Sequence, residues 1–302
     1  MKRLCEGRVV IVTGAGRGIG RAHALGFAAA GAKVVVNDLG AGVDGSGASM
    51  GPAEEVVDEI RRQGGEAALN GDDVADWEGA GRLVGCAVDT FGKLDVLVNN
   101  AGILRDRMLV NMEEDDWDAV IRVHLRGTYC ATRQAALHWR ERSKAGETVD
   151  ARLINTSSAS GLYGNIGQAN YAAAKAGIAA FTIVTAAELS RYGVAANAIA
   201  PGARTRMTES LFASIMAPPE QGFDAMAPEN ISPLVVWLGS EQSRAVTGRV
   251  FEVSGGTIGI AEGWRHGPSI SQENTWDPTD VGGVVTELLE RAAAPVALLG
   301  AS

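Results

Sequence analysis

Short runs rich in β-branched residues alternate with helical stretches along this 302-residue chain. The seven runs are VVIVTG from Val9, KVVVND from Lys33, EAALNGDD from Glu66, LDVLVNNAG from Leu94, ARLINTSS from Ala151, VAANAIAP from Val194 and RVFEVSGG from Arg249. Strands that are separated by helices pair in parallel, because each crossover returns the chain to the same edge of the sheet. The alternation predicts a single α/β domain of the doubly wound, Rossmann type, with a seven-stranded parallel sheet and helices on both faces.

The predicted catalytic domain covers residues 1–263, and a tail covers 264–302. Within the domain, the segment at about 203–228 lies between the sixth strand and the helix before the seventh, where we expect a substrate lid. Its LFASIMAPPE stretch suits an apolar acyl chain and suits packing of the lid equally well. The tail is expected to cap a pocket or to contact a partner subunit.

A glycine-rich turn, TGAGRGIG, joins the first strand to an Ala-rich helical stretch. Its glycines would let backbone N–H groups approach a pyrophosphate at the positive end of the helix. Without that placement between strand and helix, a tight turn would explain the glycines as well. The expected cofactor-binding residues of this turn are Gly14, Arg17, Gly18, Ile19 and Gly20.

Asp38 ends the second strand, where an acidic side chain can accept hydrogen bonds from an adenosine ribose and repel a 2′-phosphate. A solvated turn aspartate is the alternative. Arg17 favours the phosphorylated cofactor instead, because a guanidinium can bind the 2′-phosphate. The fixed carboxylate weighs more, so NAD is predicted and NADP is the less favoured alternative.

Ser158, Tyr171 and Lys175 are predicted to form the catalytic group. Tyr171 and Lys175 are four positions apart and therefore share one face of a helix. A phenol ionises near pH 10, so it needs a nearby cation to act as a base, and Lys175 can provide one. Ser158 would then hold the substrate oxygen during hydride transfer. The alternative is an ordinary helix pair whose polar ends reach water.

Composition limits the kinds of binding partner and the cellular compartment that we expect for this protein. A net charge of −9 argues against nucleic acid as a partner. The three cysteines are far apart and show no metal-ligand spacing, which indicates free thiols, no metal site and a reducing compartment. No stretch of about 18 apolar residues suggests a membrane span, so no membrane partner is expected. The predicted location is the cytoplasm.

With these motifs the chain resembles the short-chain dehydrogenase/reductase superfamily, whose NNAG motif stands at Asn99–Gly102, over about residues 7–258. The resemblance implies an NAD(P)-dependent oxidoreductase in which Tyr171 is the acid/base, Lys175 lowers its pKa and holds the nicotinamide ribose, and Ser158 positions the substrate. Further cofactor contacts implied by the resemblance are Asp73 and Val74 at adenine, Asn99 in the cleft, and Pro201, Gly202 and Thr205 after the sixth strand.

One position departs from the family pattern. The chain reads VHLRG where the family usually has an asparagine, which places His124 at that position. The family's asparagine is thought to hold a water that links the lysine to solvent. His124 could take this catalytic role through a ring nitrogen, or it could pack as a satisfied core residue, and the two interpretations stay open.

Within the superfamily, VVVNDLG, AGILRDR, WDAVIRVHLRG and the Ser158 segment resemble the (3R)-hydroxyacyl-CoA dehydrogenase part of type 2 peroxisomal multifunctional enzymes. That likeness implies a 3-hydroxyacyl or 3-oxoacyl thioester substrate, an acyl-CoA, and supports NAD. The alternatives are an NADPH-dependent 3-oxoacyl-carrier-protein reductase, a hydroxysteroid or xenobiotic carbonyl dehydrogenase, and a non-catalytic dinucleotide-binding protein. Family members are usually homodimers or homotetramers built on the long helices around the catalytic strand.

Overall fold

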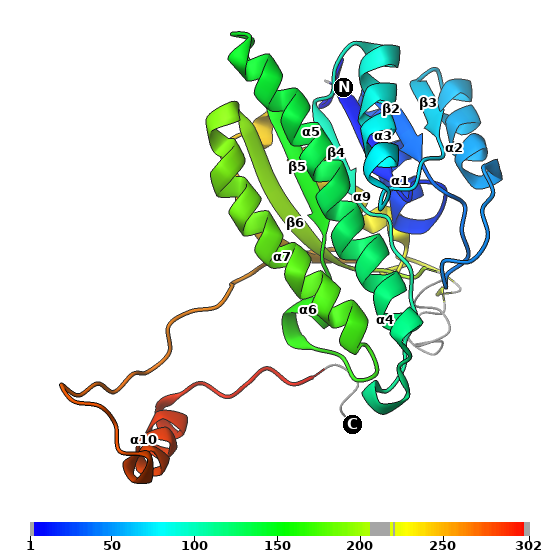
Figure 1. Cartoon of the computed structure of the whole chain (residues 1–302). Helices are drawn as coiled ribbons and strands as arrows, with labels where there is room; N and C mark the ends of the chain where they lie inside the picture. Colours follow the sequence, from blue (N-terminus) through cyan, green and yellow to red (C-terminus); the bar gives the residue numbers. More distant parts are fainter. Residues whose placement is uncertain (1–2, 206–217, 220, 299–302) are drawn as a thin grey trace.

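The computed structural model describes residues 3–205, 218–219 and 221–298. Across these residues eight strands form one sheet in the order β3-β2-β1-β4-β5-β6-β7-β8 (Figure 1). The strands are β1 Val9–Thr13, β2 Lys33–Asn37, β3 Glu66–Asn70, β4 Val96–Asn99, β5 Ala151–Thr156, β6 Val194–Gly202, β7 Val250–Ser254 and β8 Thr257–Ala261. Strands β1 to β7 are parallel, which confirms the predicted Rossmann-type arrangement.

The eighth strand corrects the predicted number of seven. It pairs antiparallel with β7, and Ser254 faces Thr257 across a two-residue turn of Gly255 and Gly256. Two glycines between two alternating runs favour a tight hairpin, because φ values above zero are accessible to glycine. The Gly-Gly pair was therefore a readable signal for this strand.

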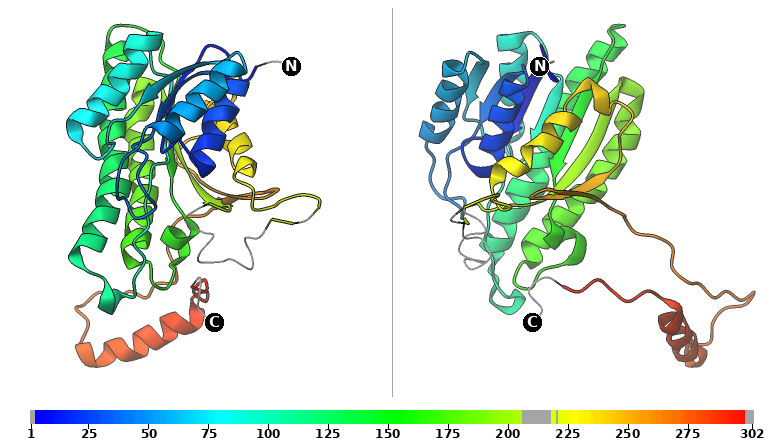
Figure 2. Two further views of the ribbon diagram at one scale, coloured as in Figure 1. Left: turned by 90° about the vertical axis from the view of Figure 1, so that its right-hand side faces the viewer. Right: turned by 180° about the vertical axis from the view of Figure 1, so that it is seen from behind.

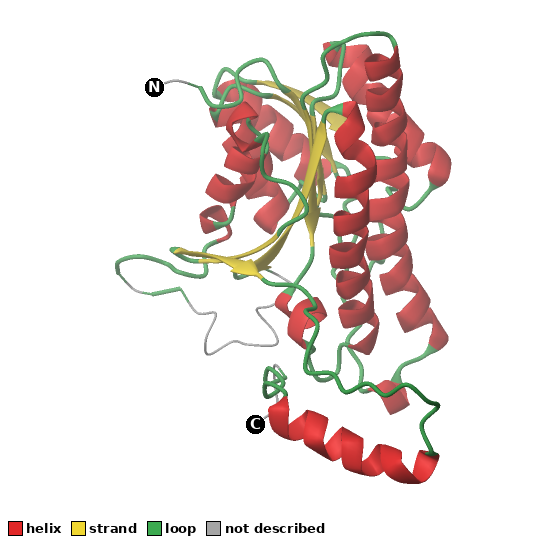
Figure 3. Cartoon of the chain, turned by 90° about the vertical axis from the view of Figure 1, so that its left-hand side faces the viewer, coloured by secondary structure: helices red, strands yellow, loops and turns green. Residues whose placement is uncertain are grey.

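Helices cover both faces of the sheet (Figure 3). The α-helices are α1 Gly18–Ala29, α2 Gly51–Arg62, α3 Trp77–Phe91, α4 Glu114–Ile121, α5 Gly127–Lys144, α6 Ala159–Tyr163, α7 Ala169–Leu189, α9 Ser232–Leu238 and α10 Pro278–Arg291. Short 3₁₀ turns lie at Leu109–Asn111, Ser190–Tyr192, Pro228–Asn230 and Glu241–Ser243, and a π-helical turn at Arg122–Arg126 joins α4 to α5.

Strand periodicity divides the core into two layers. Val10 and Val12 of β1 point into the layer with α1, α2 and α9, whereas Val9 and Ile11 point into the layer with α3, α5 and part of α7. Alternate side chains of a strand face opposite sides of a sheet, so a strand buried on both faces reads as a continuous apolar run. This explains why the first four residues of VVIVT are all apolar, whereas the hydroxyl of the last, Thr13, is hydrogen-bonded to the Val98 carbonyl.

Helix α7 differs from the expectation that no stretch of this chain is long and apolar enough to span a membrane. Together with the following turn, Ala169–Tyr192 is long and apolar enough to cross a membrane by length and composition alone, a stretch the sequence analysis missed. The helix contacts α4, α6, β5 and β6, and it buries Lys175 against the end of β5. These contacts bury one face of the helix in the body of the protein, whereas Ile183 and Val184 on it stay exposed.

The segment after β8 leaves the body of the protein and leads to α10 (Figure 2). No residue of α10 is buried, and Val281, Val285 and Leu289 form an exposed apolar stripe along it. The chain then returns, and the Leu298 side chain lies beside Gly164. A helix of this length with two interior glycines has little stability in isolation, so α10 needs a surface to pack on.

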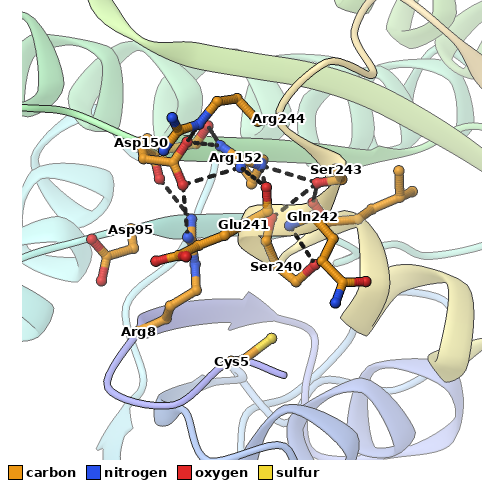
Figure 4. A network of polar contacts seen from close by, with 12 residues as sticks. Cys5, Arg8, Asp95, Asp150, Arg152, Ser240, Glu241, Gln242, Ser243 and Arg244 are labelled. Atoms are coloured by element: carbon orange, nitrogen blue, oxygen red, sulfur yellow. Dashed lines mark hydrogen bonds and ion pairs between the residues drawn. The ribbon is translucent and has the colours of Figure 1, made fainter. Parts of the chain in front are cut away.

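At the amino end of β5, Asp150 holds three arginines (Figure 4). Its carboxylate accepts hydrogen bonds from Arg8 at 3.0 Å, Arg152 at 2.9 Å and Arg244 at 2.8 Å. The Arg152 guanidinium is 1% exposed and also donates to the Ser240 carbonyl at 3.1 Å. This cluster joins β1, β5 and the segment after α9 at the edge opposite the carboxyl ends of the strands.

We predict that Asp150→Ala lowers the free energy of unfolding by roughly 3 to 5 kcal/mol, because it leaves two buried guanidinium groups without their carboxylate. Burial raises the pKa of Asp150, but hydrogen bonds from the arginines outweigh it, and the pKa lies below its ordinary value of 3.8. The carboxylate therefore stabilises the fold above that ordinary value, and the stabilisation is lost as the pH falls through the lower pKa of the folded state.

The measurement is urea unfolding of the parent and the variant at several pH values, with the exposed Asp118→Ala as the control. The difference in unfolding free energy should stay constant from pH 7 to about pH 4 and shrink only below it. A difference under about 1 kcal/mol at pH 7 would show that the arginines are stabilised by other partners.

Candidate active site

A cavity of about 480 Å³ opens at the carboxyl ends of the strands. It is bounded by the turn after β1, the loops after β2, β4 and β6, the end of β5, and α7. The predicted site residues that line it are Gly14, Arg17, Gly18, Ile19, Gly20, Asp38, Asp73, Val74, His124, Ser158, Tyr171, Lys175, Pro201 and Thr205. The fold thus brings the glycine turn and the predicted catalytic group to a single cavity.

Ser158, Tyr171 and Lys175 reach this cavity from the end of β5 and from α7. Ser158 is the N-cap of α6, and its Oγ accepts a hydrogen bond from the Ser160 amide at 3.2 Å. Lys175 Nζ donates to the Thr156 carbonyl at 2.6 Å and lies 5.5 Å from the centroid of the Tyr171 ring. The lysine thereby ties one face of α7 to the last residue of β5.

Burial governs the protonation of both groups on α7. It raises the pKa of Tyr171 to about 12, while the hydrogen bond with Ser158 opposes the rise and the charge of Asp106 adds to it. Burial also lowers the pKa of Lys175 to about 7. This differs from the expectation that Lys175 lowers the pKa of Tyr171, because the lysine is itself only partly charged near neutral pH. The protein alone holds Tyr171 as a phenol that is ready to donate a proton.

His124 lies in the π-helical turn between α4 and α5, a rare geometry that is frequent at functional sites. Its Nε2 lies 2.8 Å from the Ile103 carbonyl oxygen and 3.1 Å from the Ile103 amide nitrogen, and the tautomer decides which of the two it bonds. The ring packs edge-on against Tyr171, with centroids 5.1 Å apart.

The other ring nitrogen of His124 leaves both interpretations of this residue standing. Nδ1 is buried and has no hydrogen-bond partner among the described residues. Burial lowers the pKa of His124 to about 3, and the charge of Lys175 lowers it further while the Ile103 hydrogen bond opposes, so the imidazole is neutral. His124 is packed through Nε2, yet it carries a polar atom that a water or ligand could satisfy beside Tyr171.

The glycine turn fits a dinucleotide. Gly18 has a φ of 52°, and a Cβ on Gly20 would collide with the Gly14 carbonyl. Asn100 Nδ2 donates to the carbonyls of Thr13 at 3.0 Å and of Gly14 at 3.2 Å. The end of β4 therefore braces a turn that needs glycine at positions 14, 18 and 20, which lets backbone N–H groups at the start of α1 approach a ligand.

Asp38 is held rigidly at the edge of the cavity. Its two carboxylate oxygens accept hydrogen bonds from the Gly16 amide at 2.7 Å and the Gly40 amide at 2.6 Å. Each oxygen keeps a further lone pair for a ribose hydroxyl. Arg17 is exposed and lines the same cavity, so the geometry supports a nicotinamide dinucleotide without separating NAD from NADP.

The expected adenine contacts lie beside a charged residue that the sequence analysis missed. Asp73 accepts hydrogen bonds from Arg122 at 2.6 Å and from the Ala75 amide at 2.8 Å, and the mostly buried Val74 follows it. Arg122 lines the cavity as well. Only the fold brings it there, because it comes from the π-helical turn about fifty positions along the chain.

Two predicted cofactor residues are not among those lining the cavity. Asn99 is buried beneath it, and its amide donates to Thr132 Oγ1 at 3.0 Å and Asn155 Oδ1 at 2.9 Å. Asn99 points into the interior because it is still part of β4, and Asn100 is the residue at the surface of the cavity. Gly202, at the end of β6, packs against Ser254.

Ser160, Asn165 and Gln168 also line the cavity, and they are further residues that the sequence analysis did not single out. They belong to SASGLYGNIGQANY, whose spacing drew attention to the serine and tyrosine alone. Residues 206–217 and 220 of the expected lid lie outside the described residues.

The site and the fold together define a nicotinamide-dependent dehydrogenase. The sequence profile of the family described as "short chain dehydrogenase" matches residues 8–215, more than half of the chain, so the chain belongs to this family.

The chain is similar to several known proteins, among them the following three. It is 48% identical over 254 residues to mouse "Peroxisomal multifunctional enzyme type 2", covering 84% of this chain but only 32% of that enzyme, so the chain spans about a third of its length. It is 45% identical over 283 residues to "Hydroxyacyl-CoA dehydrogenase ChsB1" of Mycobacterium tuberculosis, which covers 91% of this chain and 86% of that one. A crystal structure of a short chain dehydrogenase from Mycobacterium avium superposes with a TM-score of 0.89 at 59% identity, covering 99% of this chain and all of the other.

His124→Ala is predicted to lower kcat roughly tenfold, less than the hundredfold or more that direct proton transfer contributes. The variant also removes a ring nitrogen that lies beside Tyr171 and Lys175, so the pH profile of kcat should change shape. Steady-state rates across pH 6 to 10 measure both effects, and the exposed His266→Ala is the control. An unchanged profile with reduced thermal stability would assign His124 to packing alone.

Proposed function

We propose that the protein catalyses NAD-dependent interconversion of a 3-hydroxyacyl and a 3-oxoacyl thioester, with an acyl-CoA as substrate. The observation that carries the proposal is the convergence of Ser158, Tyr171 and Lys175 on the cavity that also holds the glycine turn. The substrate class is supported by the hydroxyacyl-CoA dehydrogenase that matches this chain over most of both sequences.

The chain's own residues provide binding and proton transfer. Bound NAD would accept the hydride from the carbon that carries the hydroxyl group. Ser158 holds the substrate oxygen by a hydrogen bond. Tyr171 takes the hydroxyl proton during oxidation and returns it during reduction. Because the pKa of Tyr171 is about 12 in the protein alone, reduction starts from the favoured phenol form, and oxidation is favoured by high pH.

Lys175 and His124 act around the phenol. The Lys175 ammonium, fixed on the Thr156 carbonyl, favours the phenolate whenever the lysine is charged. Its pKa of about 7 means that the lysine can also release a proton within the working range of an enzyme. His124, which stays neutral, can accept or donate a hydrogen bond through Nδ1 without carrying charge to the site.

The preference for NAD rests on Asp38. Its carboxylate is fixed by two backbone amides and lines the cavity where the adenosine ribose of a dinucleotide bound to the glycine turn would lie. A 2′-phosphate there would meet a negative charge that cannot move away, whereas a ribose diol would donate hydrogen bonds to it. Arg17 is exposed, so solvent screens its charge and its support for NADP is weaker.

We predict that the protein oxidises 3-hydroxyacyl-CoA and that Tyr171→Phe lowers kcat roughly a thousandfold, because the phenol that transfers the proton is gone. Tyr192→Phe, which lies outside the cavity, is the matched control. The assay follows NADH formation with 3-hydroxyacyl-CoA, a 3-hydroxyacyl carrier protein and a hydroxysteroid. A higher kcat/KM for NADP than for NAD, together with preference for the carrier protein, would support the reductase alternative instead. Equal rates for the Tyr171→Phe variant and the parent would contradict the proposed chemistry.

We also propose that the protein forms a homodimer or homotetramer through α5 and α7. Trp77, Tyr129, Ile183 and Val184 are 38%, 45%, 52% and 53% exposed on α3, α5 and α7. The Tyr129 ring lies 6.0 Å from that of Trp77 and 6.4 Å from that of Phe181, so the apolar surface is continuous across these helices. A continuous apolar surface of this kind is typical of a protein interface. The exposed stripe of α10 would then pack on a partner subunit.

Val184→Glu is predicted to shift the protein to the monomer, because it places a charge in the centre of the proposed interface. Sedimentation velocity of the parent and the variant at the same concentration measures the change. The control is Val110→Glu, which alters a side chain that is 90% exposed away from these helices. A parent that is already monomeric at micromolar concentration would contradict the proposal.

A further inference from the structure

Asp106 is a half-buried acidic group beside the site that the mechanism above does not use. It belongs to the loop that follows β4. Its Oδ2 accepts a hydrogen bond from Gln168 Nε2 at 2.7 Å, and its Oδ1 is buried without a hydrogen-bond partner among the described residues. The neighbouring Arg107 donates to the Asp106 backbone carbonyl at 3.0 Å, and its side chain lies 3.9 Å from Asp116. The carboxylate of Asp106 therefore has no direct ion pair within the described part of the chain.

The loop is clamped to the first turn of α7. The Arg107 amide donates to the Gly167 carbonyl at 2.9 Å, and Asn170 Nδ2 donates to the Arg105 carbonyl at 3.0 Å. Asn170 Oδ1 in turn accepts from the Tyr171 amide at 2.7 Å. Hydrogen bonds thus fix the residues just before and just after Asp106, next to the helical turn that carries Tyr171.

Gln168 connects Asp106 to the serine side of the cavity. Because a carboxylate can only accept, Gln168 must turn its NH₂ group toward Asp106 and its carbonyl oxygen away. That Oε1 accepts hydrogen bonds from Ser160 Oγ at 2.9 Å and from Asn165 Nδ2 at 2.8 Å. Ser160 lies in α6, whose N-cap is Ser158. A chain of oriented hydrogen bonds therefore runs from Asp106 to the helix that begins at the catalytic serine.

We propose that Asp106 is a positioning residue with two effects: it orients Gln168 so that α6 and Ser158 are held in place, and its negative charge keeps the proton on Tyr171. The inference rests on the proposed function, because it assigns Asp106 a role in the proton transfer of that reaction. Its two effects are separable, since one depends on the shape of the side chain and the other on its charge.

The groups around Tyr171 support the effect of the charge. The Tyr171 side chain is hydrogen-bonded with Ser158 and lies beside the His124 ring and the Lys175 ammonium, while Asp106 acts on it through its charge. His124 is neutral and Lys175 is only partly charged near pH 7. These two residues therefore provide little positive charge to offset the negative charge of Asp106. The charge of Asp106 adds to the burial that raises the pKa of Tyr171.

The groups around Asp106 have opposing effects on its own pKa. Burial raises the pKa of Asp106, while the Gln168 hydrogen bond and the charge of Arg107 oppose the rise. Arg105 donates to the carbonyls of Asp44 and Asp115 on the outer side of the loop, and Asp116 pairs with Arg107. The influence of Asp106 on Tyr171 is therefore present at neutral pH and is lost on acidification earlier than for an ordinary aspartate.

Asp106→Asn tests the charge, because the amide oxygen can still accept from Gln168 while the negative charge is removed. In the oxidation direction the pH profile of kcat should move to lower pH, and kcat at pH 7 should rise roughly two- to fivefold, since removing a nearby negative charge favours the phenolate. KM for the thioester should stay within about twofold. The exposed Asp118→Asn should leave the profile unchanged.

Gln168→Leu tests the positioning, because it breaks the hydrogen-bond chain and leaves the carboxyl group of Asp106 in place; its kinetics are compared above pH 7, where the loss of a hydrogen bond that lowers the pKa of Asp106 matters least. It should raise KM for the thioester severalfold or lower kcat at all pH values without moving the profile. Asp106→Ala should show both effects. An Asp106→Asn profile that superimposes on the parent would overturn the role of the charge, and unchanged kinetics of Gln168→Leu would overturn the positioning role.

An ultraviolet titration of the phenolate separates this inference from the proposed substrate. Parent and Asp106→Asn are titrated, each against its own Tyr171→Phe counterpart, so that the difference reports Tyr171 without any substrate. A shift of the Tyr171 transition to lower pH in Asp106→Asn supports the inference even if no acyl-CoA is oxidised, in which case only the proposed substrate fails. Turnover of acyl-CoA with no shift in either experiment rejects the inference and leaves the proposed function standing.

Discussion

A buried ladder of side-chain hydrogen bonds joins the centre of the sheet to α7, and the geometry of the site depends on it. Asn99 donates to Asn155 at 2.9 Å, Asn155 donates to Thr182 at 2.9 Å, and Thr182 donates to the Ile178 carbonyl at 2.8 Å. Buried polar groups cost free energy when unpaired, so only one register of helix against strand satisfies the ladder. That register puts Tyr171 and Lys175 at the end of β5.

The site that results contains titratable groups whose surroundings favour the uncharged form. Burial raises the pKa of Tyr171 to about 12, lowers that of Lys175 to about 7 and lowers that of His124 to about 3. Each shift has the sign expected when a charge is removed from water. Charged side chains lie around these groups: Asp38, Asp73 and Arg122 line the cavity, and Asp106 lies next to the helical turn that carries Tyr171. A proton transfer at Tyr171 is therefore sensitive to every charge that a ligand brings with it.

Local patterns predicted much of this arrangement. Spacing along the chain predicted the seven parallel strands, the glycine turn and the cavity shared by Ser158, Tyr171 and Lys175. Each of these motifs is formed by residues that are close together in the sequence. Asn100, Arg122 and Gln168 could not be found in this way, since contacts between distant segments bring them to the cavity. Asn99 was predicted to line the cofactor cleft but is buried beneath the cavity. Whether a residue at the end of a strand points inward or outward depends on where the strand ends, and spacing along the sequence does not show this. The Gly-Gly hairpin before β8, in contrast, was readable and was overlooked.

The two loops that cover the cavity are bonded to each other. The Leu104 amide donates to the Val43 carbonyl at 2.9 Å, and Arg105 donates to the Asp44 carbonyl at 2.9 Å. The first loop continues from Asp38, and the second carries Ile103, which holds His124, and Asp106. Hydrogen bonds thus join the loop beside Asp38 to the loop beside Tyr171. Any displacement of the loop after Asp38 would therefore pull, through these bonds, on the loop that holds His124 and Asp106.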